Sequence, residues 1–150
     1  MAKRIKSVNR PINELIVHYS ATPVGMEVNA DKIREWHITD RGWKDIGYHY
    51  VILPDGKVEI GRDIAQTGAH CVLHNFESVG ICYVGGLDEN GKAADTRTKE
   101  QKIALRAVLT TLKSIFLDAK VYGHKNLGKT ACPGFDAKAE YEDISSIVLE

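Results

Sequence analysis

A histidine and a cysteine stand eight positions apart in a loop-forming stretch near the end of the chain. His124 and Cys132 lie in GHKNLGKTACPG, residues 123–134, where glycines and a proline interrupt regular structure. The cysteine could fill a core, form half of a disulfide, act as a nucleophile or bind a metal, and the spacing alone does not choose among these. The chemistry of the segment therefore depends on the side chains that the fold brings to it.

A second histidine lies inside the most apolar predicted strand. His18 belongs to ELIVHYSA, residues 14–21, a β-branched run typical of a strand that is buried on both faces. A buried imidazole needs a polar partner, and a backbone carbonyl would be sufficient. AKVYGH, residues 119–124, predicts another short strand that ends at His124. If the two strands are neighbours, His18, His124 and Cys132 converge at one edge of the sheet.

Two imidazoles and one thiolate form a donor set that suits Zn²⁺. Three protein ligands leave a fourth position open for water, as in catalytic zinc sites, whereas a structural site takes a fourth protein ligand. The candidates for such a ligand are His37, His49, His70 and His74. A cysteine hydrolase that uses Cys132 with His124 and no metal is a further alternative.

The remaining segments predict a hairpin and several helices. GYHYVILPDGKVEIGR, residues 47–62, indicates two strands joined by a Pro-Asp-Gly turn, and SVGICYVGG, residues 78–86, indicates a buried strand. A long loop, residues 67–77, separates them. Asn29 is expected to cap a short helix whose core-facing stripe holds Ile33, Trp36 and His37.

Thr98 and Gln101 form a capping-box pattern at the start of a long helix. Its predicted core face carries Ile103, Ala107, Val108, Leu112 and Ile115. A last short helix is expected to begin near residues 135–136. The elements together predict an α/β fold, a single mixed β-sheet flanked by helices, with the zinc site at one edge of the sheet.

Composition limits the class of protein. A chain of 150 residues with 43% apolar residues predicts one domain, with a basic leader over residues 1–12 and a core over residues 13–150. Twenty basic and twenty acidic residues balance, which argues against nucleic-acid binding. No apolar run suits a signal peptide or a membrane span. The three scattered cysteines argue against a disulfide framework, and we expect a cytoplasmic monomer.

Four segments, in order, carry a family resemblance: IVHYSAT, GWKDIGYHYVILPDGKVEIGR, GAHCVLHNFESVGICYVGG and GHKNLGKTACPGFD. Together they resemble the zinc-dependent N-acetylmuramoyl-L-alanine amidases, which include phage lysozymes and, as relatives, the peptidoglycan recognition proteins. The resemblance runs from about Glu14 to Asp136. It implies hydrolysis of the amide between the lactyl group of N-acetylmuramic acid and the L-alanine of the stem peptide, and cell-wall lysis of the endolysin kind.

The resemblance also implies roles for individual residues. It places the zinc ligands on His18, His124 and Cys132 and the essential tyrosine on Tyr48. Thr130 stands where the phage lysozymes carry a lysine and where active recognition proteins often carry threonine, and with Tyr48 it would donate a hydrogen bond to the developing oxyanion.

Two further histidines receive different expectations. His70 matches a site-lining position in the family, so we assign it to substrate binding, although a lone loop histidine could equally be exposed and idle. Strand alternation sends Tyr48 and Tyr50 to one face and His49 to the other, so we expect His49 to be a buried structural hydrogen-bonding group. No carboxylate matches the position of a general base.

The alternative function is a protein of the same fold that binds peptidoglycan without cleaving it, or that regulates a polymerase. The second possibility comes from the resemblance alone, because the phage lysozyme of the family also binds and restrains the RNA polymerase of its phage. The chain keeps all three ligand types and the tyrosine, which favours the enzyme. We expect it to act on the cell wall after another factor releases it from the producing cell.

Overall fold

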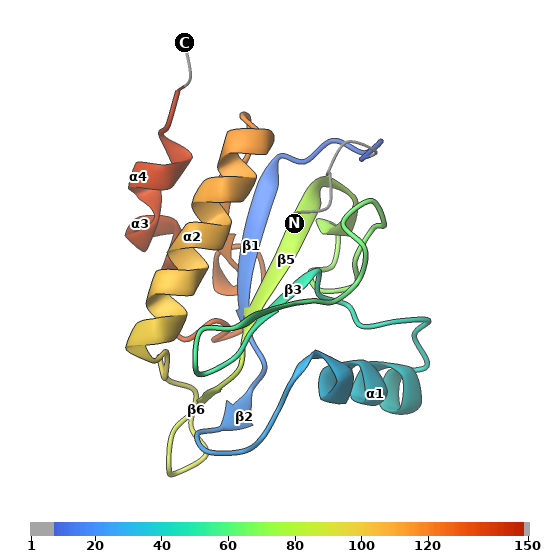
Figure 1. Cartoon of the computed structure of the whole chain (residues 1–150), viewed down its shortest axis with the longest axis vertical. Helices are drawn as coiled ribbons and strands as arrows, with labels where there is room; N and C mark the ends of the chain where they lie inside the picture. Colours follow the sequence, from blue (N-terminus) through green and yellow to red (C-terminus); the bar gives the residue numbers. More distant parts are fainter. Residues whose placement is uncertain (1–7, 149–150) are drawn as a thin grey trace.

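A computed structural model describes residues 8–148 and contains a five-stranded mixed sheet (Figure 1). The strand order is β4-β3-β5-β1-β7. Its strands are β1 (Glu14–Tyr19), β3 (Tyr50–Ile52), β4 (Val58–Ile60), β5 (Ser78–Tyr83) and β7 (Lys120–Gly123). β1 pairs in parallel with β5 and β7, and β3 pairs in parallel with β5 and antiparallel with β4. The predicted mixed sheet and its hairpin are confirmed.

Helices cover both faces of this sheet. The helices are α1 (Ala30–Arg41), α2 (Lys99–Ile115), α3 (Ala137–Glu140) and α4 (Glu142–Ser145), with 3₁₀ turns η1 (Asn75–Glu77) and η2 (His124–Asn126). Figure 1 shows α2, α3 and α4 on one side of the sheet and α1 on the other. A small parallel pair, β2 (Thr22–Pro23) and β6 (Gly86–Leu87), lies beyond the ends of β1 and β5. None of the helices within residues 8–148 combines the length and apolarity needed to cross a membrane.

Successive side chains of β1 and β5 point to opposite faces of the sheet, and each face has its own hydrophobic core. Leu15 and Val17 pack with α2 in the larger core, together with Val79 and Ile81. Cys82 packs with α1 in the smaller core on the opposite face. Because successive side chains of a strand point to opposite faces, His18 emerges on the α1 side, at the carboxyl end of β1. A strand in the middle of the sheet therefore carries the first predicted ligand.

The predicted helix caps are confirmed, and the predicted core face of α2 is correct at Val108 and Leu112 but wrong at its other three residues. Ile103 is 63% exposed and Ile115 42% exposed, and Ala107 also faces solvent. The buried apolar residues are Leu105, Leu109 and Leu112. The apolar residues of α2 are spread around much of its circumference, so periodicity alone does not identify the buried face. Its rotation follows from Gln101, whose Nε2 donates hydrogen bonds to the carbonyls of Ile52 and Val84.

The end of the predicted basic leader packs into the fold. The Arg10 side chain is buried and donates hydrogen bonds to the carbonyls of Ser78 at 2.7 Å and Ile64 at 2.9 Å. Ile12 is buried in the larger core. The first seven residues of the leader lie outside the described residues. Arg10 thus ties the loop between β4 and β5 to the start of β5.

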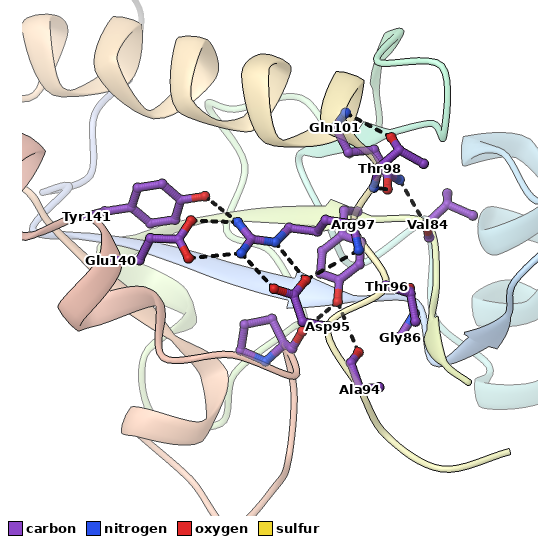
Figure 2. A network of polar contacts seen from close by, with 12 residues as sticks. Val84, Gly86, Ala94, Asp95, Thr96, Arg97, Thr98, Gln101, Glu140 and Tyr141 are labelled. Carbon is purple, nitrogen blue, oxygen red and sulfur yellow. Dashed lines mark hydrogen bonds and ion pairs between the residues drawn. The ribbon is translucent and has the colours of Figure 1, made fainter. Parts of the chain in front are cut away.

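A second buried arginine joins α3 to the segment before α2 (Figure 2). The Arg97 guanidinium contacts the carboxylates of Asp95 and Glu140 and donates to the Tyr141 hydroxyl at 2.8 Å. It also lies 3.4 Å from the centroid of the Phe135 ring. Since Phe135 follows Cys132 by three positions, this network fixes the end of the loop that carries the cysteine.

Candidate metal centre and active site

The structure brings His18, His124 and Cys132 together. One potential ligand atom from each residue lies within 4.8 Å of the other two, and residues 8–148 contain no other such group of three. His18 lies near the end of β1, and His124 directly follows β7, which pairs in parallel with β1. The register pairs Val17 with Gly123, so the next residue of each segment is one of the histidines.

The spacing of the donors fits a tetrahedral zinc ion. His18 Nδ1 lies 3.7 Å from Cys132 Sγ. Typical zinc distances of about 2.3 Å to sulfur and 2.1 Å to nitrogen imply a separation of roughly 3.6 Å in a tetrahedral site. Imidazole nitrogen and thiolate sulfur are also ligands that zinc commonly takes in proteins. The three side chains therefore fit zinc in both spacing and chemistry.

Burial keeps both ligand histidines neutral. It lowers the pKa of His18 well below its ordinary value, with the His70 and His124 rings adding to the effect. Burial also lowers the pKa of His124, with His74 adding to it. Neutral imidazoles have the free lone pair that a metal requires. Burial raises the pKa of Cys132 to about 12, against the hydrogen bond from the Tyr19 amide, so a cation is needed to hold the thiolate.

Backbone contacts shape the loop that carries Cys132. The Lys125 amide donates to the Cys132 carbonyl at 2.6 Å, and the Tyr19 amide donates to Cys132 Sγ at 3.2 Å. The Tyr83 hydroxyl donates to the Pro133 carbonyl at 2.7 Å. A Cβ on Gly123 would fall 2.8 Å from Cδ of Pro133, so only glycine lets the loop approach β7 this closely.

His70 lies directly beside the first ligand. Its Nδ1 is 2.8 Å from Nε2 of His18, and its Nε2 is 3.1 Å from the Ser78 hydroxyl. The ring also lines the cavity next to the metal cluster. The structure therefore places His70 in contact with both the cavity and the His18 ring.

Tyr48 also faces the cavity, on the side opposite Tyr50. The Tyr48 ring centroid lies 5.1 Å from that of His18, and Tyr48 packs with the smaller core, whereas Tyr50 packs with the larger one. The predicted common face is wrong because β3 begins only at Tyr50, so strand alternation does not extend to Tyr48. Burial raises the pKa of Tyr48 well above its ordinary value, and the thiols of Cys82 and Cys132 add to this, so the phenol stays protonated.

Thr130 lies outside the cavity that Tyr48 lines. Its side chain is exposed and does not line the cavity, and its hydroxyl accepts a hydrogen bond from the Cys132 amide at 3.2 Å. Thr130 thus contacts the backbone of a ligand residue. Lys129, the preceding residue, is also exposed.

The other histidines have separate structural partners. His49 is fully buried, accepts a hydrogen bond from the Gly80 amide through Nδ1 and lies 2.8 Å from the Gln66 carbonyl, which confirms its predicted structural role. His37 accepts a hydrogen bond from the Gly47 amide at 2.9 Å. His74 pairs with Glu14 at 2.8 Å. In the described chain, neither these histidines nor His70 join the metal cluster as a fourth ligand.

The cluster opens into a cavity of about 1040 Å³. Helix α1 and the loop after it supply one wall, formed by Trp36, His37, Asp40, Arg41 and Trp43. The sequence predicted that Trp36 and His37 face a core. They instead line this cavity, although Trp36 also packs against the smaller core. The helical period located this face of α1, but it gave no sign that a cavity lies beside it.

The remaining cysteines take no part in the cluster. Cys82 is fully buried in β5, as predicted, and Cys71 lies in the loop after His70 and is 3% exposed. All three cysteines are free thiols. Burial raises the pKa of Cys71 to about 11, with Glu14 adding to the effect, which leaves it a weak nucleophile.

Comparisons with known proteins identify the family. A model of the N-acetylmuramoyl-L-alanine amidase family matches residues 8–135. The endolysin of Klebsiella phage KP32 is 40% identical over 142 residues, covering 95% of this chain and 93% of its own length. The endolysin of Escherichia phage T7 is 41% identical over 128 residues, covering 85% and 84%.

A solved structure gives the same result for the fold. The N-acetylmuramoyl-L-alanine amidase LysC from Clostridium intestinale matches with a TM-score of 0.75 and 29% identity, over 93% of this chain and 87% of that one. The matches extend over the strands and the loop that carry the three clustered side chains. The chain therefore belongs to the N-acetylmuramoyl-L-alanine amidase family, whose members hydrolyse the amide between N-acetylmuramic acid and L-alanine in peptidoglycan.

Proposed function

We propose that the chain performs this hydrolysis with a zinc ion held by His18, His124 and Cys132, and that it lyses the cell wall as its endolysin relatives do. The amidase activity itself follows from family membership. The observation that supports the zinc site is the convergence of the three donors within 4.8 Å beside a cavity of about 1040 Å³. We propose that the catalytic core, predicted over residues 13–150, also includes Arg10 and Ile12, which pack into the fold. We also propose that the chain reaches its substrate after another factor releases it from the producing cell.

The metal supplies chemistry that no neutral side chain here can supply. When bound, zinc lowers the pKa of a coordinated water to about 7 and polarises a carbonyl group. His18 and His124 contribute neutral nitrogen ligands and Cys132 one negative charge, so the site keeps a net charge of about +1. With zinc bound, that charge would favour an oxyanion at the scissile amide.

Tyr48 acts on the same developing charge. Its phenol stays protonated, since burial raises its pKa, and it lines the cavity beside His18. We propose that it donates a hydrogen bond to the oxyanion. Thr130 does not line the cavity, so we propose that it acts through Cys132 instead, because its hydroxyl accepts a hydrogen bond from the Cys132 amide. Removing one such donor typically lowers kcat by about 10²–10³.

The walls of the cavity suit a glycopeptide substrate. Trp36 and Trp43 present apolar ring surface, and the Arg41 guanidinium lies 5.2 Å from the centroid of the Trp43 ring at the same wall. Arg41 can pair with a carboxylate of the stem peptide, while the indole rings pack against sugar or alkyl groups. The binding partner is accordingly peptidoglycan or a soluble muropeptide.

Mass spectrometry of defined muropeptides tests the proposal. The protein is analysed for metal and incubated as purified, after chelation, and after chelation followed by added zinc. We expect free stem peptide with an L-alanine amino terminus only in the zinc-containing samples. His18→Ala should abolish the product and the bound zinc, whereas the control His74→Ala, which replaces a histidine outside the cavity, should retain both.

Two results would contradict the proposal. Cleavage that survives chelation but stops on thiol alkylation would indicate a cysteine hydrolase that uses Cys132 and His124. Intact muropeptide in the presence of one bound zinc per chain would leave a protein that binds peptidoglycan without cleaving it.

A further inference from the structure

Two glycines and an asparagine constrain His70. A Cβ on Gly80 would fall 2.7 Å from the ring, so glycine at this position of β5 is what lets the ring lie against the sheet. A Cβ on Gly68 would fall 2.8 Å from Cδ2 of the same ring. Asn75 Oδ1 accepts hydrogen bonds from the amides of His70 and Cys71 at 2.8 and 2.9 Å, which fixes the backbone. The ring is therefore much more constrained than an ordinary loop histidine.

The contacts of His18 and His70 determine which nitrogen of each ring carries the proton. His18 Nδ1 is the nitrogen that faces Cys132 Sγ, so it must offer its lone pair to the metal, and the proton of the neutral ring then sits on Nε2. This Nε2 lies 2.8 Å from His70 Nδ1, which must accept. The proton of His70 is left on its own Nε2, 3.1 Å from the Ser78 hydroxyl. Each donor in this series meets an acceptor.

We propose that His70 is a positioning residue that orients His18 for zinc and holds it in the Nε2-protonated tautomer. The inference rests on the proposed zinc site. A histidine ligand commonly donates its second ring N–H to a carboxylate, a carbonyl or water, and removing such a partner typically lowers metal affinity about 10–100-fold. Here an imidazole takes that place, supported by Ser78. His70 acts through His18, and substrate affinity is not its main contribution.

A pair of variants separates this role from packing. In His70→Asn the side-chain oxygen can take the place of Nδ1 and accept from His18, although the contact with Ser78 is lost. In His70→Leu the volume is similar, but no acceptor remains. His74→Asn is the matched control, because His74 pairs with Glu14 and does not line the cavity.

Zinc affinity is measured by competition with a chromophoric chelator, and the metal-free proteins are compared by thermal unfolding. We expect His70→Leu to bind zinc about 10–100-fold more weakly than the wild type. His70→Asn should recover most of this loss, and His74→Asn should match the wild type. The cobalt-substituted proteins supply a second readout: the absorption spectrum of His70→Leu should differ from that of the wild type, and that of His70→Asn should not.

Other results would overturn the inference. If His70→Leu binds zinc as tightly as the wild type but has a raised KM for muropeptide, His70 contacts substrate and the proposed zinc site stands. If both His70 variants lose affinity equally, and in proportion to a lower Tm of the metal-free protein, the role is packing. If the wild type binds no zinc, or if His18→Ala binds it as well as the wild type, both the inference and the proposed site fail.

Discussion

Replacing Arg97 by methionine should destabilise the fold by about 3 kcal/mol. The Arg97 side chain is only 2% exposed and donates to both oxygens of Asp95 and both oxygens of Glu140 at 2.8–2.9 Å (Figure 2). Removing one partner of a buried ion pair typically costs about 3–5 kcal/mol. The lower end applies here, because Asp95 is 31% and Glu140 40% exposed, and water can solvate both once the guanidinium is absent.

Urea and thermal unfolding measure this loss. For a chain of this length, about 3 kcal/mol corresponds to a fall in Tm of roughly 6–12 °C. Arg106→Met is the matched control: Arg106 on α2 pairs with Asp143 at 2.7 Å, but these side chains are 45% and 66% exposed. An exposed pair contributes about 0–1 kcal/mol. Equal losses for the two variants would refute the argument that burial makes Arg97 different.

The contribution of Arg97 should also depend on pH. Burial opposes the charge of Asp95, but its hydrogen bonds with Arg97 outweigh this and hold its pKa below the ordinary value; Arg97 lowers the pKa of Glu140 as well. A carboxylate with a depressed pKa in the folded state stabilises the fold above its unfolded pKa, near about 4, and this stabilisation disappears as the pH falls through the folded value. The difference between wild type and Arg97→Met should therefore be constant near neutral pH and shrink below about pH 4.

Three further changes test separate parts of the molecule. Tyr48→Phe should lower kcat for muropeptide about 10²–10³-fold with zinc affinity and Tm unchanged, and near-normal turnover would exclude the phenol as a donor. Gln101→Leu removes a buried donor to the carbonyls of Ile52 and Val84 and should cost about 1–3 kcal/mol in urea unfolding, where a negligible loss would contradict its role in fixing α2. Gly80→Ala should displace His70 and weaken zinc binding. Gly128→Ala is the control, because its Cβ would lie an ordinary 3.6 Å from His124 and zinc affinity should not change. Equal zinc affinities for the two variants would show that β5 can accommodate the methyl group.

The sequence predicted the metal cluster because two of its members depend on short-range rules. His18 and His124 each follow an apolar, β-branched segment, and parallel neighbours place the ends of such segments together. The sequence did not establish that these two strands are neighbours. The structure shows that β1 and β7 pair in parallel. Caps and the hairpin were also predictable, since each depends on residues within a few positions of one another.

Errors arose where long-range packing decides. The buried face of α2 depends on hydrogen bonds from Gln101 to backbone carbonyls 17 and 49 positions away in the sequence, and helical periodicity carries no information about these contacts. The sequence assigned Arg10 to a basic leader, yet its guanidinium donates hydrogen bonds to four carbonyls, those of Ile64, Asn75, Phe76 and Ser78. The partner of His18 was unpredictable for the same reason: His70 is 52 positions away and reaches it only because Gly80 has no side chain.

The three ligand residues differ in what holds them, and this difference connects metal binding to the stability of the fold. His18 belongs to a strand paired on both sides, and His124 follows a strand paired with β1, so the sheet fixes both backbones without a metal. Cys132 lies in a loop that depends on tertiary contacts, including the Tyr83 hydroxyl on Pro133 and the stacking of Arg97 on Phe135. These contacts hold Cys132 in place and so strengthen zinc binding. Because coupling is reciprocal, bound zinc must stabilise the contacts by the same free energy. The buried ion-pair network and the metal site therefore act on the same loop, the network at Phe135 and the metal at Cys132.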